Sequence, residues 1–549
     1  MPPQLKSQAP EDLVRAVQTI EDTADVGHRN LGIFTYGRNL ARWAVLARII
    51  LQIEQTILDK GYRSQTQNAV MLNVGRGGAQ ALSWINELST SDPVSGREFV
   101  FDAPLFAAAS QALWAAVSYE SFTSTFPLWH KNVVAADLVS ANVVRFAGED
   151  VDSRRVRAYL QGLKPAADRE PQLELGEALE PAVKEKIGNI ASNAAGDRSS
   201  FTYGNPTRLY GQLSQRYLEL SQSLYRHEDF LLLGTYTVGQ FRSFYSALLA
   251  VCAVHEHACF LRAQLTSQYP ANSGVMVRRL ERWVRLLSKI SDLPEQIVAD
   301  IVGDLVFGAT KTLDLYVHPF VTLAEDHKLL GIVPHFPLKS RPDENILRVC
   351  SLLRPAFFDA ITHAKEGRMR EELKAGAYGG FKIRGPRTLP GGLPDIDLIV
   401  EDAPSSTVVL AELKWLRKAI RSVEHIGQEA AFLRGIGQLE KIAEFLRQNP
   451  LFLLERGDVS DDLSKFKNVY YVLVPRDYFV WVDPANGIPV IEYDAFSRVL
   501  SRSTNLAAGM EELLTFDWLP KEGSDFEIKY ETFSVNSVSV ETEVIYAKY

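Results

Sequence analysis

Four charged residues in two neighbouring apolar segments are the strongest sign of chemistry in this chain. Asp395 and Asp397 lie in the first segment, and Glu412 and Lys414 lie at the end of the second. Because the side chains of a strand alternate between its two faces, each pair shares one face of its strand. Residues 401–407, which include Asp, Pro and Ser, favour a turn that joins the two segments as a hairpin. The pattern predicts a divalent-metal site with a lysine beside it.

This set of residues suits the hydrolysis of a phosphodiester bond. That reaction needs a metal that polarises the phosphate and lowers the pKa of an attacking water. Mg²⁺ prefers hard oxygen ligands and keeps several waters, so one or two carboxylates with a substrate phosphate suffice. We expect Asp397, Glu412 and the Leu413 carbonyl to bind Mg²⁺, for which Mn²⁺ is expected to substitute. Lys414 would then stabilise charge on the phosphate or orient the water.

The segments around these residues predict an α/β layer that positions them. A helical pattern at 342–374 is followed by a loop rich in Gly and Pro at 376–392 and then by the hairpin. A long helix is expected at 422–447 and a strand at 469–474. The order helix, strand, strand, helix, strand predicts a mixed sheet covered by helices. Alternation after residue 525 predicts a terminal hairpin, a C-terminal β extension of the domain at 341–549.

The sequence PDIDLIV at 394–400, followed by VVLAELK at 408–414, resembles the PD-(D/E)xK nuclease superfamily. The resemblance covers roughly residues 345–480, about a quarter of the chain. It implies a restriction-endonuclease-like domain in which Glu412 and Lys414 form the Glu-x-Lys pair. Of the two aspartates, Asp397 is the preferred metal ligand and Asp395 is second.

The resemblance also implies a glutamate from the preceding helix and a glutamine from the following one. Glu366, Glu371 and Glu372 are candidates for the glutamate, and we expect Glu372 to be the one that joins the metal ligands. Gln438, in the run GIGQLEKIAEFL, matches the glutamine better than Gln428 does.

A basic loop without acidic residues precedes the hairpin and carries Lys382, Arg384 and Arg387. These side chains are expected to bind nucleic-acid phosphates, and a solvated basic loop is an equally good interpretation.

Residues 1–340 are expected to be all-α, because apolar residues recur there at helical spacing over long segments. The β-branched segment 127–147 is strand-like, and the polar stretch at 165–200 marks a subdomain break. His255 and His257 are two residues apart, so on a helix they point in different directions and cannot chelate one ion. We expect this region to recognise substrate, to sense a trigger or to build a homo-oligomer.

Composition limits the class of protein. The chain has 549 residues with 46% hydrophobic and 23% charged residues, as in ordinary globular proteins. Its net charge of −8 argues against a protein that binds polyanions over its whole surface, but not against a local basic groove. The three cysteines show no paired spacing, no apolar run is long enough for a membrane span, and the N-terminus lacks a signal-peptide core. We therefore expect a cytoplasmic protein without membrane contact.

The expected fold class is α + α/β, with a large all-α region followed by a restriction-endonuclease-like domain with a mixed central sheet. The expected function is that of a Mg²⁺-dependent endonuclease whose expected substrate is DNA. By analogy of architecture it would be a bacterial anti-phage defence or restriction effector. Two alternatives stay open: cleavage of RNA, and a helical scaffold or partner-binding protein whose nuclease-like domain binds nucleic acid without cutting it.

Overall fold

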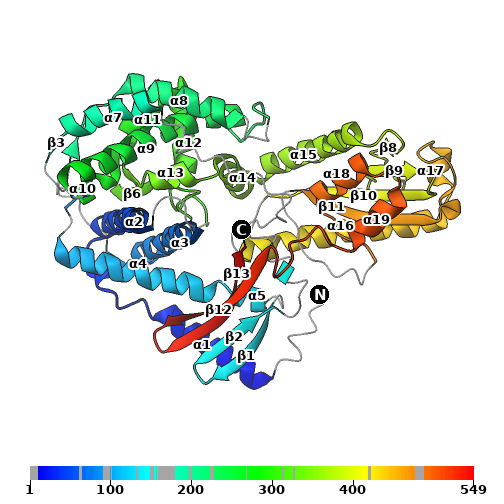
Figure 1. Ribbon diagram of the computed structural model, residues 1–549, viewed down its shortest axis with the longest axis horizontal. Coiled ribbons are helices and arrows are strands. Elements are labelled where there is room, and N and C mark those ends of the chain that lie inside the picture. The colour runs from blue at the N-terminus through cyan, green and yellow to red at the C-terminus, as the bar shows by residue number, and fades with distance from the viewer. Residues whose placement is uncertain are drawn as a thin grey trace.

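The computed structural model describes residues 10–548 apart from 61–64, 91–98, 101, 131–133, 149–153, 156–157, 159–179, 197–200, 223–227, 268, 312–313, 325–327, 418–421 and 477–486. The protein is of the α+β type, with a helical region on one side and a smaller α/β domain on the other (Figure 1). Most of the predicted subdomain break at 165–200 lies outside the described residues, and a helix occupies 181–193.

The helical region is formed by long helices that pack side by side. Their apolar residues recur at helical spacing, and two large clusters of buried side chains result. The bounds of these helices are α1 (Glu11–Val26), α2 (Arg38–Lys60), α3 (Gln65–Leu88), α4 (Ala103–Thr123), α5 (Phe126–His130), α7 (Pro181–Asn193), α8 (Thr207–Gln222), α9 (Val238–Thr266), α10 (Ala271–Gly274), α11 (Leu280–Ser291), α12 (Glu295–Asp304) and α13 (His335–Lys339). A short 3₁₀ helix lies at Gly32–Thr35.

The prediction that this region is all-α was wrong, because three small sheets lie within it or at its edge. Their strands are β1 (Ala135–Ser140), β2 (Val143–Ala147), β3 (Ala195–Gly196), β4 (Phe201–Thr202), β5 (Met276–Arg279), β6 (Val321–Ala324) and β7 (Leu329–Ile332). The strand-like pattern at 127–147 is confirmed from residue 135 onward, whereas 126–130 is helical. Short strands of this kind carry too few residues for a reliable period in the sequence.

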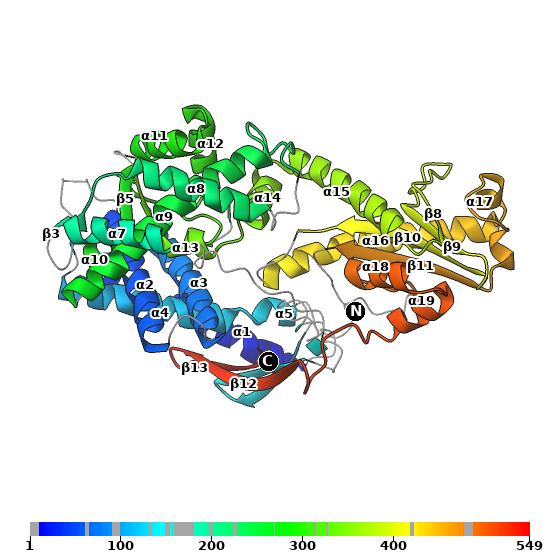
Figure 2. The same cartoon turned by 45° about the horizontal axis from the view of Figure 1, so that its top comes forward.

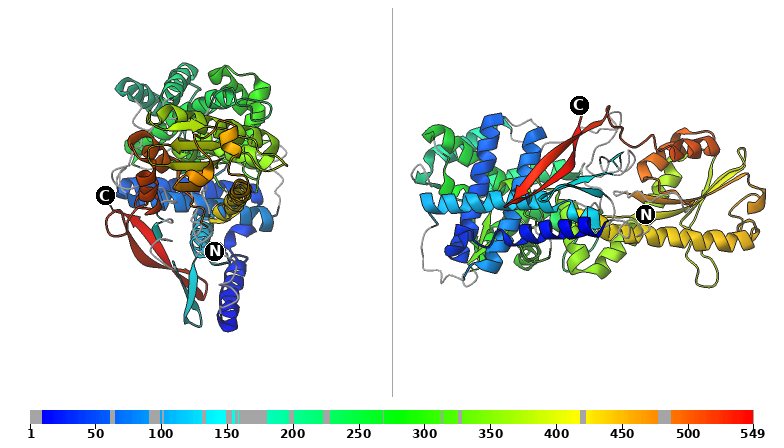
Figure 3. Two further views of the ribbon diagram at one scale, coloured as in Figure 1. Left: turned by 90° about the vertical axis from the view of Figure 1, so that its right-hand side faces the viewer. Right: turned by 90° about the horizontal axis from the view of Figure 1, so that it is seen from below.

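The terminal hairpin is confirmed as β12 (Phe526–Val535) and β13 (Val538–Ala547), which pair antiparallel. It is not an extension of the α/β sheet, however. Strand β13 pairs in parallel with β2, so the order of this sheet is β1-β2-β13-β12. Figure 3 shows the red strands beside the cyan ones. The C-terminus therefore returns to the N-terminal part of the chain.

The α/β domain is built on a mixed four-stranded sheet, as predicted. Its order is β11-β10-β9-β8, with β10 antiparallel to β9 and parallel to β11. The bounds are β8 (Lys382–Arg384), β9 (Leu398–Asp402), β10 (Thr407–Trp415) and β11 (Asn468–Arg476). The predicted hairpin is thus β9–β10, and its first strand begins at Leu398 rather than before Asp395.

Helices cover both faces of this sheet because its strands are apolar on both faces. Leu413 and Trp415 of β10 pack in the cluster that includes α15 and α18, whereas Val408 and Leu410 pack in the cluster that includes α16. The helices of the domain are α15 (Pro355–Gly376), α16 (Ser422–Gln448), α17 (Phe452–Glu455), α18 (Tyr493–Arg502) and α19 (Leu506–Leu514), with a 3₁₀ turn at Leu463–Lys465. Helix α14 (Pro342–Leu353) precedes them and packs against α9 and α15. Helix α16 confirms the helix predicted at 422–447.

Two helices of the α/β domain connect it to the helical region. Helix α15 starts beside α14 and extends along the sheet (Figure 2). Helix α16 contacts α5 and runs away from the helical region, so the end of β10 that precedes α16 faces that region (Figure 1). Among the described residues, α9 is the one helix long and apolar enough to cross a membrane, and it is mostly buried, as core helices of soluble proteins also are.

Candidate active site at the end of strand β10

The site forms where β10 continues beyond the end of β9. Pairing between these strands stops at Ala411 and Leu398, so the backbone amides of Leu413 and Trp415 have no strand partner on that edge. Side-chain carboxylates take the place of the missing strand. Leu413 N–H donates to Asp397 Oδ2 at 2.9 Å, and Trp415 N–H donates to Glu366 Oε1 of α15 at 3.3 Å. An exposed strand edge therefore brings two acidic side chains to the same place.

Glu412 and Lys414 lie on the opposite face of β10 from Leu413, as the period-two pattern predicts. The Lys414 Nζ forms an ion pair with Glu412 Oε1 at 2.6 Å, and Glu412 is only 3% exposed. Helix α16 covers this pair closely: a Cβ added to Gly435 would lie 3.6 Å from Lys414 Cε and 2.8 Å from Leu473 Cδ1. Glycine at 435 therefore lets α16 pack closely on Leu473 of β11, beside the lysine.

Burial and the neighbouring charges shift the pKa values of all four groups. Burial and the nearby Asp397 raise the pKa of Glu412 to about 7, against the opposing pull of Lys414. Burial also raises the pKa of Asp397 and that of Glu366, although the Leu413 and Trp415 amides and Lys414 oppose the shifts. Burial lowers the pKa of Lys414, but the three carboxylates more than offset it, so that pKa is raised. Lys414 is therefore held in its ammonium form.

The chain's own donors fit a hard divalent cation. Three carboxylates surround one lysine, so the cluster carries more negative charge than Lys414 compensates. The N–H and C=O of one residue point to the same edge of an antiparallel strand, so the Leu413 carbonyl lies at the edge where Asp397 binds its amide. No group of three or more His, Cys, Asp or Glu side chains close enough to share an ion occurs in the described part of the chain. Two carboxylates and a carbonyl suit Mg²⁺, which keeps several waters, better than a cation that needs a full protein cage.

Glu366, not the expected Glu372, is the helix glutamate at the site. Glu372 instead bonds to Arg476 Nη1 at 2.6 Å, to Arg368 Nε at 2.9 Å and to the Tyr493 hydroxyl at 3.1 Å. The third candidate, Glu371, is exposed and pairs with Lys374. Six residues separate Glu366 from Glu372, which turns them to different sides of α15. The residue types do not reveal which side meets the strand edge.

Two glutamines of α16 were candidates, Gln438 and Gln428. The Gln428 amide donates to the carbonyl of Arg417, which follows β10, and its Oε1 is buried without a hydrogen-bond partner. Gln438, the predicted residue, lies three residues after Gly435, the position at which α16 comes close to Lys414. Three residues are about one helical turn, so Gln438 stays a candidate on the lysine side of the cluster.

Asp395 and the basic loop lie outside the cluster. Asp395 is exposed and precedes β9. Arg387 forms an ion pair with the buried Asp458 at 2.5 Å, and Arg384 donates to the carbonyl of Gly457, so both arginines hold the 457–458 turn against β8. Lys382 is exposed on β8. Of the three predicted phosphate-binding residues, two thus have a structural partner.

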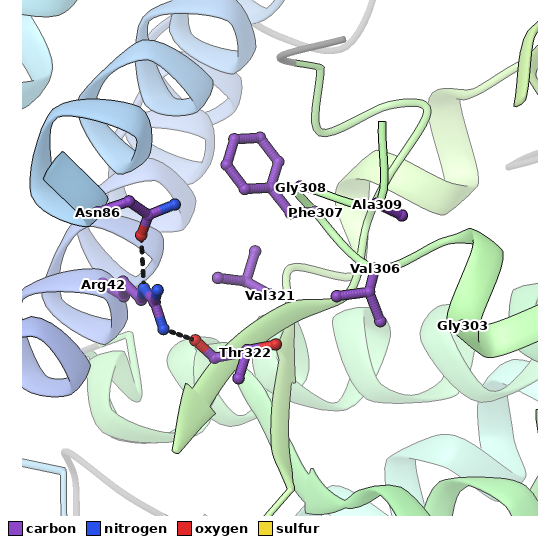
Figure 4. Close-up of a pocket in the computed structure, with 9 residues that line it drawn as sticks. All are labelled: Arg42, Asn86, Gly303, Val306, Phe307, Gly308, Ala309, Val321 and Thr322. Atoms are coloured by element: carbon purple, nitrogen blue, oxygen red, sulfur yellow. Dashed lines mark hydrogen bonds between the residues drawn. The ribbon is translucent and has the colours of Figure 1, made fainter. Parts of the chain in front are cut away.

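A separate cavity of about 440 Å³ lies in the helical region between α2, α3 and β6 (Figure 4). Arg42 is its charged lining residue, and this side chain donates to Asn86 Oδ1 at 2.7 Å and to the Thr322 carbonyl at 2.8 Å. These bonds join three elements of the fold. The lining contains no carboxylate, so this cavity does not offer the chemistry found at β10.

Searches of protein-family models, curated proteins and solved structures found no match to this chain. The function is therefore argued from the geometry of the cluster at β10.

Proposed function

We propose that the protein is a metal-dependent nuclease with a restriction-endonuclease-like α/β domain, and that DNA is its substrate. The observation that carries this proposal is the cluster at the end of β10. Asp397 directly precedes β9, Glu412 and Lys414 lie on the neighbouring strand β10, and Glu366 joins them from α15. Burial of three carboxylates against one ammonium is unfavourable unless a further cation binds.

Each residue has a distinct role in the proposed reaction. Asp397, Glu412 and the Leu413 carbonyl would hold Mg²⁺ or Mn²⁺. Bound there, the cation supplies a Lewis acid that polarises the phosphate and lowers the pKa of water. Lys414 stays protonated, so its ammonium would stabilise the negative charge of the phosphate rather than accept a proton. Glu366 holds the Trp415 amide and fixes α15 against the strand edge.

The position of the cluster supports a polymeric substrate. The end of β10 faces the helical region, and α5 of that region contacts α16. A strand of nucleic acid bound at the cluster would therefore lie beside the helical region, which would recognise it.

The test is a cleavage panel of single-stranded and double-stranded DNA and RNA with Mg²⁺ or Mn²⁺. Wild type is compared with Lys414→Ala, which removes the ammonium while leaving the strand pairing in place. We expect metal-dependent cleavage of DNA by wild type and its loss in the variant. Cleavage of RNA alone would reassign the substrate. Salt-dependent binding of nucleic acid without cleavage by wild type would instead favour the scaffold alternative.

A further inference from the structure

One face of α15 carries three basic residues, one before Glu366 and two after it. His363, Glu366, Arg370 and Lys374 follow one another at spacings of three, four and four residues, so they share one face of the helix. Glu366 shows where this face points, because it binds the Trp415 amide at the end of β10. Further along, Lys374 Nζ donates to the Gly385 carbonyl at 3.3 Å. The face therefore runs along the edge of the cluster.

The contact of Lys374 with Gly385 places one end of this face against the aspartate side of the site. A Cβ on Gly385 would lie 2.4 Å from the carbonyl oxygen of Asp397, so these two backbones are in direct contact. Near the other end, His363 Nδ1 lies 3.9 Å from Glu366 Oε2, and the His363 side chain is 83% exposed. The stretch between them holds Arg370.

Arg370 is the arginine whose charge acts on Asp397. Its guanidinium turns back along the helix: a Cβ added to Gly367 would lie 3.7 Å from Arg370 Nη2. Its ion pair with Glu371 spans 3.5 Å, and the Glu371 side chain is 64% exposed. The Arg370 side chain is only 20% exposed, but its partner carboxylate is largely solvated, so the pair contributes little. The guanidinium is thus held near the cluster by a partner that exchanges readily.

Charge balance gives this arginine a role. One divalent cation and Lys414 neutralise the three carboxylates, and a phosphodiester then adds one more negative charge. Lys414 is already paired with Glu412, so a second cation beside Asp397 would compensate this charge. A planar guanidinium binds phosphate oxygens in pairs, which a lysine cannot do.

We propose that Arg370 is a substrate-binding residue that holds a non-bridging phosphate oxygen of the nucleic-acid strand at the Asp397 side of the cluster. Lys374 and His363 extend the contact to neighbouring phosphates along the same face of α15. This inference rests on the proposed function and adds to it the path of the strand, along α15 rather than over the basic loop before β9.

Arg368 is the matched control. It lies two residues away on the same helix, but its side chain is directed to Glu228 and to Glu372, with 2.9 Å between Arg368 Nε and Glu372 Oε1. Substitution of either arginine by alanine removes the same charge from α15. A difference between the two variants therefore reports position rather than net charge.

The test measures binding of a fluorescent DNA oligonucleotide in Ca²⁺ over a range of salt concentrations, together with kcat and KM in Mg²⁺. For Arg370→Ala we expect roughly ten-fold weaker binding and a plot of log affinity against log salt that is shallower by about one phosphate contact. Arg370→Lys should keep the slope and lose part of the affinity. Arg368→Ala should match wild type in both, and thermal melting should show all variants folded.

Equal binding and equal slopes for Arg370→Ala and wild type, with wild type cleaving DNA, would overturn the role of Arg370 and leave the nuclease proposal intact. An equal loss in Arg368→Ala would also overturn it, because a general loss of positive charge would then explain the effect. A wild-type protein that neither binds nor cleaves nucleic acid would overturn both proposals.

Discussion

Two groups of buried charge lie along helix α15, one at its start and one near its middle, and they are built differently. At the start of the helix, Arg354 bonds to both oxygens of Asp304 at 2.7 and 2.9 Å, and the Tyr236 hydroxyl donates to the same carboxylate at 2.5 Å. Further along, Glu366 joins Asp397, Glu412 and Lys414. The first group matches one carboxylate with one guanidinium, whereas the second places three carboxylates around one ammonium.

The difference separates a structural ion pair from a binding site. In the Asp304 group the negative charge of Asp304 is balanced by the positive charge of Arg354. The hydrogen bonds between these two side chains raise the pKa of Arg354. At the end of β10, burial and repulsion raise the pKa of Glu412 to about 7. The first group therefore stabilises the fold by itself, whereas we propose that the second is stabilised when a cation binds. Four predictions test this contrast.

The largest effect is expected for Glu412→Gln, which removes a proposed metal ligand while keeping the shape of the side chain. Loss of the metal removes several kcal/mol of transition-state stabilisation, so cleavage should fall by about 10³-fold or more. The same change removes repulsion, and the melting temperature in EDTA should be unchanged or higher. Cleavage assays and thermal melts of the same preparation measure both. Retained cleavage by a folded variant would remove Glu412 from the reaction.

Asp304→Ala should have the opposite effect to Glu412→Gln: it should lower the stability of the fold. Loss of one partner leaves Arg354 unpaired near the core, which costs about 3 kcal/mol of the free energy of unfolding. Urea unfolding followed by circular dichroism measures the loss. A stability equal to that of wild type would show that the Asp304 group is not the structural anchor described above.

Glu366→Gln and Glu372→Gln separate the two sides of α15. Because Glu366 fixes the Trp415 amide beside the cluster, its change should lower activity by roughly 10-fold to 100-fold, as loss of groups that orient metal ligands does. Glu372 binds Arg476 and Tyr493 instead, so its change should affect activity by less than about three-fold. Initial cleavage rates for both variants decide between them, and a larger effect at Glu372 would contradict the assignment of Glu366.

The smallest effect concerns pH. Because the pKa of Glu412 is raised in the folded protein, the metal-free fold binds this proton more tightly than the unfolded chain does, and stability falls as pH rises from the ordinary glutamate pKa to about 7. Mg²⁺ competes with the same proton. The rise in melting temperature caused by Mg²⁺ should therefore be greater at about pH 8 than at about pH 6. Glu412→Gln should abolish this dependence, and an equal rise at both pH values in wild type would contradict it.

The sequence was sufficient where local patterns decide the structure. Alternation in β10 put Glu412 and Lys414 on one face, and the turn before it produced the β9–β10 hairpin. The sequence was insufficient where the structure depends on how distant elements pack against one another. The residues of α15 do not reveal that Glu366 rather than Glu372 meets the strand edge, and those of α16 do not reveal that Gln428 bonds to the segment after β10. Likewise, nothing local indicates that β13 pairs with β2, nearly 400 residues earlier.

The most direct test of the cation site is DNA cleavage by wild type and Glu412→Gln, purified identically and assayed with Mg²⁺, with Mn²⁺ and with EDTA. We predict that wild type cuts with either metal and not in EDTA, and that Glu412→Gln cuts in none of the three. Equal cleavage by the two proteins, or cleavage by wild type in EDTA, would contradict the assignment of the cluster at β10 as a metal-dependent active site.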